Sequence, residues 1–307
     1  MEDRIIAYGG QAVLEGVLMR GQNALAIAMR APDGEIKVHT EKLSGIYKSR
    51  VASIPFLRGT ILLWDALGLG MKALTISANT QTGEDEKLEG PALYGTMALS
   101  LTIMIGVFFL LPYGAGRLVQ WLILGAAAPA AQAVFPFTPD VWAAAAVEGL
   151  VRLGLLVGYL WLIAKMPDIR RLFQYHGAEH KTINAFEAGA ELTPESVAKF
   201  PLEHPRCGTS FLLTLVLLSI VAFSFLQPLP WAWQVAARIL LIPVLAGIAL
   251  EYIRWVANHL DAGFVRWLIR PNLALQKLTT REPDLGMLEV SIRSFNEMQT
   301  AERELVL

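Results

Sequence analysis

The residues best suited to chemistry lie in one short stretch of the chain, residues 165–207. His176 and His180 are four residues apart, so on a helix both imidazoles lie on one face and can bind the same metal ion. Glu179 lies between them, where a carboxylate can act as general base on a metal-bound water. The spacing H-x-x-E-H is that of the inverted zincins. This pattern predicts a metal site with Glu179 as its catalytic base.

Two further metal ligands are available in the same stretch, His204 and Cys207. Pro205 keeps this pair off a helix, so both side chains are expected to project from a turn. Zinc accepts imidazole and thiolate readily; three protein ligands plus a water make a catalytic site, and four make a closed structural site. We expect zinc, or another divalent metal, with His176, His180, His204 and Cys207 as its ligands. Both a closed structural site with all four ligands and a catalytic site in which one of them leaves a position for water stay open.

Four more polar residues are candidates for the site. Glu187 belongs to the same stretch, whereas Glu251, Arg254 and His259 gather at the end of the last apolar segment. Glu251 follows His180 at a separation in the range at which inverted zincins place a distant glutamate ligand. Ordinary polarity at a membrane interface explains the same group equally well.

The composition indicates a membrane protein. Hydrophobic residues make up 54% of the 307 residues and charged residues 17%, with a mean hydropathy of +0.45, whereas a soluble domain carries about 25% charged residues. A disordered chain is excluded, and an ordinary soluble enzyme does not fit. The net charge of −1 gives no reason to expect a nucleic-acid partner. A single cysteine allows no intrachain disulfide, which fits a reducing compartment.

The apolar residues concentrate in four segments, each about 20 residues long, which matches the roughly 30 Å hydrocarbon core of a bilayer. The predicted spans are Ala92–Leu111, Val141–Ala164, Gly208–Leu226 and Trp231–Leu250. Leu118–Val134 is a further apolar stretch, either a fifth span or an interfacial or re-entrant segment. With four spans, all strongly basic segments fall on one side, which the positive-inside rule assigns to the cytosol together with both termini.

We therefore expect a mainly α, polytopic helical membrane protein in three regions. Residues 1–91 form a small cytosolic α+β region with a β-hairpin, in which 24–29 and 35–40 flank Pro32-Asp33-Gly34, and an amphipathic helix over 56–78. Residues 92–250 form the four-span region, which includes the cytosolic 165–207 loop. Residues 251–307 form a cytosolic tail with a helix that follows the N-cap residue Asp284.

Several long motifs, in order along the chain, carry a family resemblance. They are GGQAVLEGVLMR (9–20), IPFLRG (54–59), YHGAEHKTINAFE (175–187), HPRCGTSF (204–211) and LQKLTTREPD (275–284). With these motifs the chain resembles the YqhQ-like family of bacterial integral membrane proteins, commonly described as predicted metal-dependent enzymes. The resemblance implies the bacterial inner membrane and adds Glu15 and Arg20 as site candidates. On composition alone, the segment that holds them is a glycine-rich turn and strand.

Two functions follow from these features. The first is a zinc-dependent hydrolase at the cytosolic membrane face, acting on a peptide or a lipid headgroup. The second is a non-catalytic membrane assembly or interaction protein with a structural metal site. A small transporter is less favoured, since neither an inverted repeat nor a pair of broken helices is visible in the sequence. Gly154 and Gly158 would permit close helix packing, and so a homo-oligomer.

Overall fold

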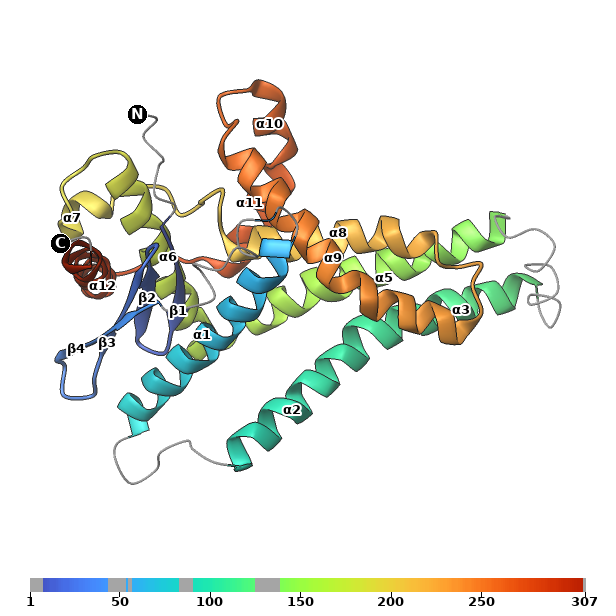
Figure 1. The fold of residues 1–307 in the computed structure, drawn as a ribbon, viewed down its shortest axis with the longest axis horizontal. Coiled ribbons are helices and arrows are strands. Elements are labelled where there is room, and N and C mark those ends of the chain that lie inside the picture. Colours follow the sequence, from blue (N-terminus) through green and yellow to red (C-terminus); the bar gives the residue numbers. More distant parts are fainter. Residues whose placement is uncertain (1–7, 44–53, 55–56, 83–90, 125–138, 306–307) are drawn as a thin grey trace.

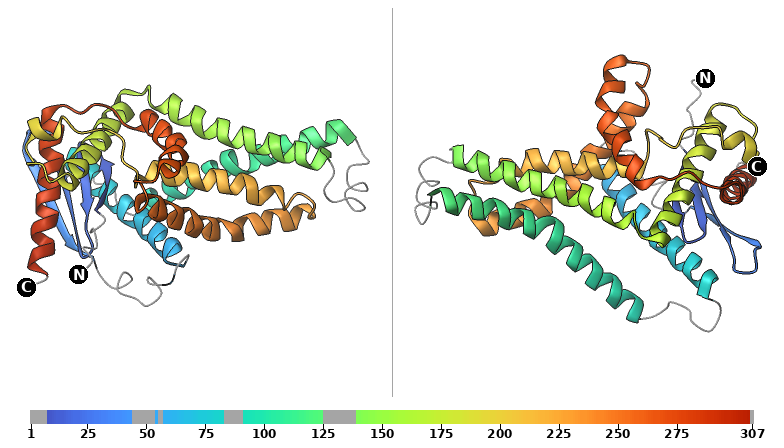
Figure 2. Two further views of the ribbon diagram at one scale, coloured as in Figure 1. Left: turned by 90° about the horizontal axis from the view of Figure 1, so that it is seen from above. Right: turned by 180° about the vertical axis from the view of Figure 1, so that it is seen from behind.

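The computed structural model describes residues 8–43, 54, 57–82, 91–124 and 139–305. The described residues form two parts: a small sheet covered by helices, and a bundle of long apolar helices that extends away from it (Figures 1 and 2). Most elements are helices and the sheet lies near the N-terminus, which confirms the mainly α class with a small β element.

The sheet is an antiparallel meander in which each strand pairs with the next along the chain. Its strands are β1 (Gly9–Val13), β2 (Gly16–Arg20), β3 (Ala24–Arg30) and β4 (Ile36–Lys42). Pro32-Asp33-Gly34 connects β3 to β4, and Gly34 has a φ of +88°, which glycine adopts without steric cost. The predicted hairpin is therefore confirmed.

Helices cover both faces of the sheet, so the six residues of β3 before Arg30 are all buried. Leu25, Ile27 and Met29 point to one face, where they pack with Ala73 of α1 (Leu57–Thr82). Since side chains alternate along a strand, the small residues between them point to the opposite face. There α12 (Leu285–Glu304) lies close enough for the Ser294 hydroxyl to reach a β3 carbonyl at 3.0 Å.

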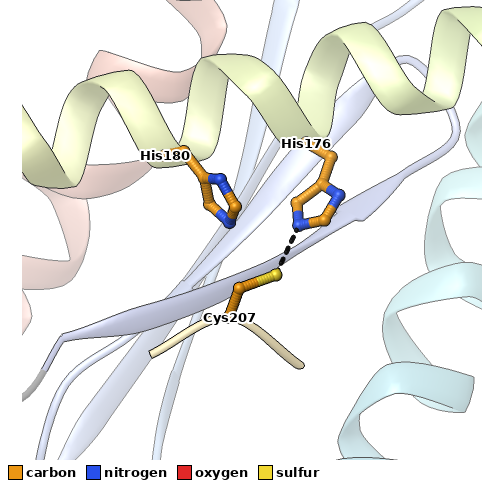
Figure 3. A group of neighbouring side chains, drawn as sticks. All are labelled: His176, His180 and Cys207. Atoms are coloured by element: carbon orange, nitrogen blue, oxygen red, sulfur yellow. Dashed lines mark hydrogen bonds between the residues drawn. The ribbon is translucent and has the colours of Figure 1, made fainter. Parts of the chain in front are cut away.

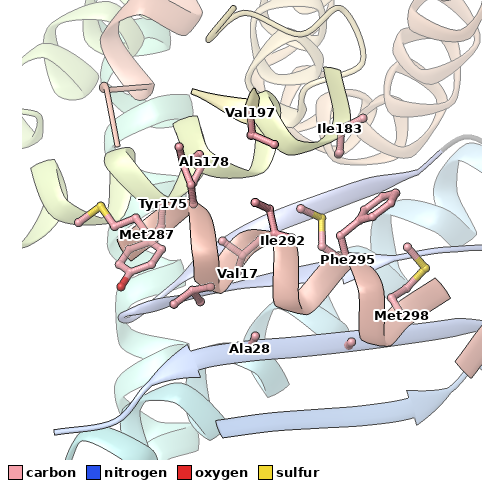
Figure 4. Packing of buried hydrophobic residues seen from close by; sticks show 14 of the residues in the cluster. Val17, Ala28, Tyr175, Ala178, Ile183, Val197, Met287, Ile292, Phe295 and Met298 are labelled. Carbon is pink, nitrogen blue, oxygen red and sulfur yellow. The ribbon is translucent and has the colours of Figure 1, made fainter. Parts of the chain in front are cut away.

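The face that packs on α12 belongs to the main core of the protein (Figure 4). Val17 and Ala28 from the sheet, Tyr175 and Ile183 from α6 (Pro167–Glu187), and Phe295 from α12 are members of this cluster. The three expected regions of the chain thus each contribute to one packed unit. The predicted tail helix is confirmed, because the Asp284 side chain accepts a hydrogen bond from the Met287 amide at 2.8 Å and begins α12.

The bundle contains three helical stretches that are long and apolar enough to cross a membrane, counted over the described part of the chain. They are Gly95–Ile123, Val141–Ile163 and Trp231–Ala257. The position of the remaining predicted span holds a shorter apolar helix, α8 (Gly208–Ser224). The elements that form the long stretches are α2 (Pro91–Ile105), η3 (Gly106–Leu110), α3 (Leu111–Leu124), α5 (Pro139–Ile163) and α9 (Trp231–Ala257).

The first long helix extends further than the predicted end at Leu111. A π-helical turn, η3, joins α2 to α3 and the helix continues to Leu124. Pro112 lacks the N–H that a regular helix needs, and the wider turn before it keeps the helix continuous. Leu118–Val134 is the apolar stretch for which the sequence leaves a fifth span or an interfacial or re-entrant segment as alternatives. Its residues 118–124 belong to this helix, whereas residues 125–134 lie outside the described part of the chain.

The candidate residues lie where the bundle meets the sheet. α5 ends there and leads into α6, and α8 begins there (Figure 1). A short helix, α7 (Pro194–Val197), lies between α6 and α8 in the chain, and α10 (Gly263–Leu268) and α11 (Arg270–Thr279) follow α9. α11 packs against α8, and α12 packs against the sheet. The C-terminal region therefore contacts both the bundle and the sheet at the place where the two parts meet.

Candidate metal centre

His176 and His180 lie on one face of α6, as the four-residue spacing predicts. Both rings point toward Cys207, which comes from the loop beneath the helix (Figure 3). Ligand atoms of these three residues all lie within 4.8 Å of one another. His176 Nε2 and Cys207 Sγ are 3.2 Å apart, and tetrahedral zinc would hold such a pair about 3.6 Å apart. Small side-chain movements would therefore let the group bind an ion.

Backbone carbonyls orient both imidazole rings. His176 Nδ1 lies 2.8 Å from the Thr279 carbonyl, and His180 Nδ1 lies 2.5 Å from the Leu202 carbonyl. With Nδ1 donating its proton to a carbonyl, Nε2 carries the lone pair that a metal requires. This is the usual arrangement of metal-bound histidines, in which a second shell fixes the tautomer.

Cys207 is held at the start of α8. It is the N-cap residue, and its sulfur accepts a hydrogen bond from the Thr209 amide at 3.4 Å. The partial positive charge of a helix N-terminus favours a negative ligand there. Gln276 of α11 fixes the preceding loop, because its side chain accepts from the His204 amide and donates to the His204 carbonyl. The sulfur is thus positioned by two helices.

Glu179 is buried beside the group but outside it. Its Oε2 lies 3.9 Å from His176 Nε2, and its carboxylate accepts a hydrogen bond from the Gly10 amide of β1. A Cβ at position 10 would lie 2.9 Å from Glu179 Cγ, so the strand approaches this closely only as glycine. Burial raises the pKa of Glu179 to about 7, against the opposing charge of His176. A carboxyl group with such a pKa exchanges protons readily near neutral pH.

The segment after α11 passes very close to α6. A Cβ at Gly177 would lie 2.2 Å from the Arg281 carbonyl oxygen and 2.8 Å from Leu202 Cδ2. The Leu202 carbonyl orients His180 and the Thr279 carbonyl orients His176. Arg281 lies two residues after Thr279 in the same segment. Gly177 therefore allows the helix and both supporting segments to meet.

Gly177→Ala is expected to lower the stability of the fold by about 1–3 kcal/mol through overpacking. In an open helix the same change would instead stabilise by up to about 1 kcal/mol. Thermal unfolding of the detergent-solubilised chain, followed by circular dichroism, measures the effect. Gly154→Ala in α5 is the matched control, since no atom lies within 4 Å of a Cβ there. Equal melting temperatures for the two variants would contradict the close contact.

His204 and Glu187 lie next to the site rather than in it. His204 is not among the three clustered ligands, although its ring centroid is 5.7 Å from that of His180. Its Nε2 lies 3.7 Å from Glu187 Oε2, and burial lowers the pKa of His204 although Glu187 opposes this. Glu187 also accepts a hydrogen bond from Arg206. The two residues therefore tie the end of α6 to the loop that carries Cys207.

Glu15 ties the sheet to the start of α6. It occupies the turn between β1 and β2 with a φ of +54°, and its carboxylate accepts from Arg171 at 2.6 Å and from the Tyr175 hydroxyl at 3.2 Å. Tyr175 directly precedes His176 in the helix. Glu15 thus helps to fix where the helix carrying the ligands lies on the sheet.

The other candidates do not join the three ligands. Arg20 ends β2, and Glu251 and Arg254 lie in the last turns of α9. His259 follows α9, where its Nδ1 contacts the Trp255 carbonyl at 2.7 Å and its ring stacks on the indole of Trp255. None of the four is a member of the metal-ligand group found among the described residues.

Three supporting residues were not predicted as part of the site: Gly10, Gln276 and Thr279. The composition around Gly10 indicates a turn and strand, and the other two lie in a motif that carries the family resemblance without containing a metal ligand. Their presence in these motifs was the available signal.

Long apolar helices and a sheet-supported His/His/Cys group define a membrane protein with a candidate metal centre. The chain belongs to the family described as "Protein of unknown function (DUF1385)", whose model matches residues 54–301. It is similar to "Uncharacterized protein YqhQ" of Bacillus subtilis (strain 168), with 35% identity over 301 residues, 95% of this chain and 92% of the relative. The YqhQ-like resemblance is therefore confirmed. No solved structure matches the chain.

Proposed function

We propose that the chain is a zinc-dependent hydrolase of the bacterial inner membrane, with its site at the cytosolic face. The observation that carries the proposal is the grouping of His176, His180 and Cys207 with a buried carboxyl group, Glu179, beside them. Three protein ligands leave one tetrahedral position for a water, and zinc would lower the pKa of that water to about 7.

In this proposal, His176, His180 and Cys207 would hold the ion, which would activate a water, and Glu179 would accept a proton from that water. The Gly10 amide keeps the Glu179 carboxylate in place. Glu179 lies beside His176, which has a side chain 17% exposed and is the ligand nearest to solvent. The buried positions of His180 and Cys207 limit the entry of bulk water.

The substrate is expected at the membrane boundary. Cys207 caps the apolar helix α8, so the site lies level with the beginning of that helix. The positive-inside rule assigns this end of the bundle to the cytosol, because the basic segments 165–207 and 254–307 lie there. A membrane-bound peptide or a lipid headgroup would reach such a site, which is the substrate class we propose, with both termini cytosolic and α8 as the fourth span.

The zinc-loaded full chain, reconstituted in vesicles of phosphatidylethanolamine and phosphatidylglycerol, tests this function. One probe is fluorescently labelled casein added outside, and the other is the vesicle lipid, whose headgroup release is followed by mass spectrometry. Cleavage of one probe that stops with 1,10-phenanthroline and returns with zinc is expected. Cleavage that continues at full rate after complete zinc removal would contradict the proposal.

Burial of the ligands favours a second candidate, a membrane assembly or interaction protein with structural zinc. His180 is 1% exposed and Cys207 is 6% exposed, as in closed structural sites. This candidate requires the ion for folding but no proton transfer by Glu179. The Glu179→Gln variant therefore distinguishes the two candidate functions, because only the hydrolase would lose its activity.

A further inference from the structure

A second site lies inside the bundle, and its one charged lining residue is near the middle of α5. It is a cavity of about 290 Å³ between α2, η3, α5, α8 and α9, close to the lower limit of about 300 Å³ for ligand pockets. Its walls are almost wholly apolar, and Leu156, Val216 and Leu245 are among the lining residues. Leu101 and Leu212 at the edge are exposed, so the cavity opens toward the surface that faces lipid.

One charged side chain lines this apolar cavity, Arg152. It is 3% exposed, and its Nη1 is buried without a hydrogen-bond partner among the described residues. Its Nη2 donates to Glu148 at 2.7 Å, and its Nε contacts the Phe108 carbonyl of the π-helical turn at 3.4 Å. Arg152 Nη1 thus lacks a hydrogen-bond acceptor among the described residues, while the rings of Phe223 and Phe109 lie 5.0 and 5.9 Å from the guanidinium carbon.

The charges around Arg152 do not balance. Glu148 also accepts from Arg238 at 2.9 Å, so two guanidinium cations share one carboxylate within the membrane-spanning helices. Arg238 is 6% exposed and its Nε likewise has no hydrogen-bond partner within the described structure. An unpaired positive charge within a bilayer is costly, and such charges mark functional sites. An anionic group at the Arg152 Nη1 would balance the cluster.

The lining residues of the cavity follow two helices lengthwise. On α5 its lining runs from Arg152 to Leu160, about 12 Å at 1.5 Å per residue. On α8 it runs from Phe223 to Leu212 in parallel. We propose that this cavity binds a long-chain carboxylic acid, with the carboxylate on Arg152 and the alkyl chain along α5 and α8 toward the opening at Leu101 and Leu212, through which the end of a longer chain extends into the lipid.

A carboxylic acid fits better than a phosphate lipid for a physical reason. Arg152 lies near the middle of α5, so the ligand headgroup must pass through hydrocarbon to reach it. A carboxylic acid can make this passage in its neutral form and ionise beside the guanidinium, whose Nη1 then donates a charge-assisted hydrogen bond to the carboxylate. A phosphate stays charged near neutral pH and would cross at a much higher cost.

Binding of tritiated palmitate to the delipidated full chain in dodecyl maltoside tests this site. We expect about one equivalent per chain, with hexadecanol at least about tenfold weaker because it lacks the charge. Arg152→Gln is expected to weaken palmitate binding by about tenfold or more. Because this variant also disturbs the Glu148 pair, Val216→Phe gives a second test that fills the cavity and leaves the charges in place.

Leu240→Phe is the matched control for Val216→Phe, since Leu240 is exposed on α9 and does not line the cavity. Palmitate binding is expected to be lost in Val216→Phe and kept in Leu240→Phe. Equal binding of palmitate and hexadecanol, or unchanged binding in Val216→Phe, would overturn the proposal. Displacement of palmitate by hexadecyl phosphate at equal affinity would contradict the assignment of a carboxylic acid as the ligand and would favour a lipid phosphate.

Discussion

Replacing His180 with alanine is expected to remove the bound zinc from the purified chain. Structural zinc in peptides binds with about 10–16 kcal/mol, so one ligand of four accounts for about 3 kcal/mol, or about a hundredfold in affinity. His180 would supply its Nε2 from a ring that the Leu202 carbonyl already orients, and it is one of the three clustered ligands. Elemental analysis after dialysis against a weak chelator measures the loss.

Two other histidines provide the controls for this variant. His39 lies exposed in β4, so His39→Ala should keep its zinc. His204→Ala should keep most of its zinc as well, because His204 lies outside the three clustered ligands. Loss of zinc from His204→Ala as complete as from His180→Ala would show instead the four-ligand site, which is the other alternative that the sequence leaves open.

Glu179→Gln is expected to lower the turnover of the cleaved probe by about 10²–10⁴-fold, the usual contribution of a general base. Glutamine has the same shape, and its side-chain oxygen can still accept from the Gly10 amide, so the fold and the zinc content should not change. The decisive readout is the ratio of activity to bound zinc, measured on the same preparation with the probe that the wild type cleaves.

The result distinguishes the two proposed functions. A catalytic site loses activity at full zinc occupancy, whereas a structural site tolerates the change. Glu187→Gln is the matched comparison, since Glu187 contacts Arg206 and His204 rather than the clustered ligands. Full activity of Glu179→Gln at full zinc content would exclude Glu179 as the base.

The residues that could be predicted for the site are those with a local spacing rule. His176, His180 and Glu179 are placed by the period of a single helix, so the sequence shows their relative positions directly. Cys207 is distant in sequence, yet few residue types bind zinc, which made it a clear candidate. His204 is a candidate on the same grounds, but it lies just outside the ligand group, where it contacts Gln276 and Glu187.

The supporting contacts could not be derived from spacing, because they join distant parts of the chain. Gly10 meets Glu179, and Thr279 meets His176, only after the sheet and the C-terminal helices have packed around α6. Likewise, the hairpin and the tail helix have local signals and were predicted, whereas the packing of α12 on the sheet has none. In the bundle, apolar length located the helices, but the π-helical continuation through Pro112 had no such signal.

Zinc-edge X-ray absorption on the purified, zinc-loaded full chain tests the central claim most directly. We expect one sulfur at about 2.3 Å and two imidazole nitrogens at about 2.0–2.1 Å, with a fourth light atom from solvent. Cys207→Ser should remove the sulfur contribution alone. A spectrum without sulfur, or with sulfur retained in Cys207→Ser, would contradict a centre formed by His176, His180 and Cys207.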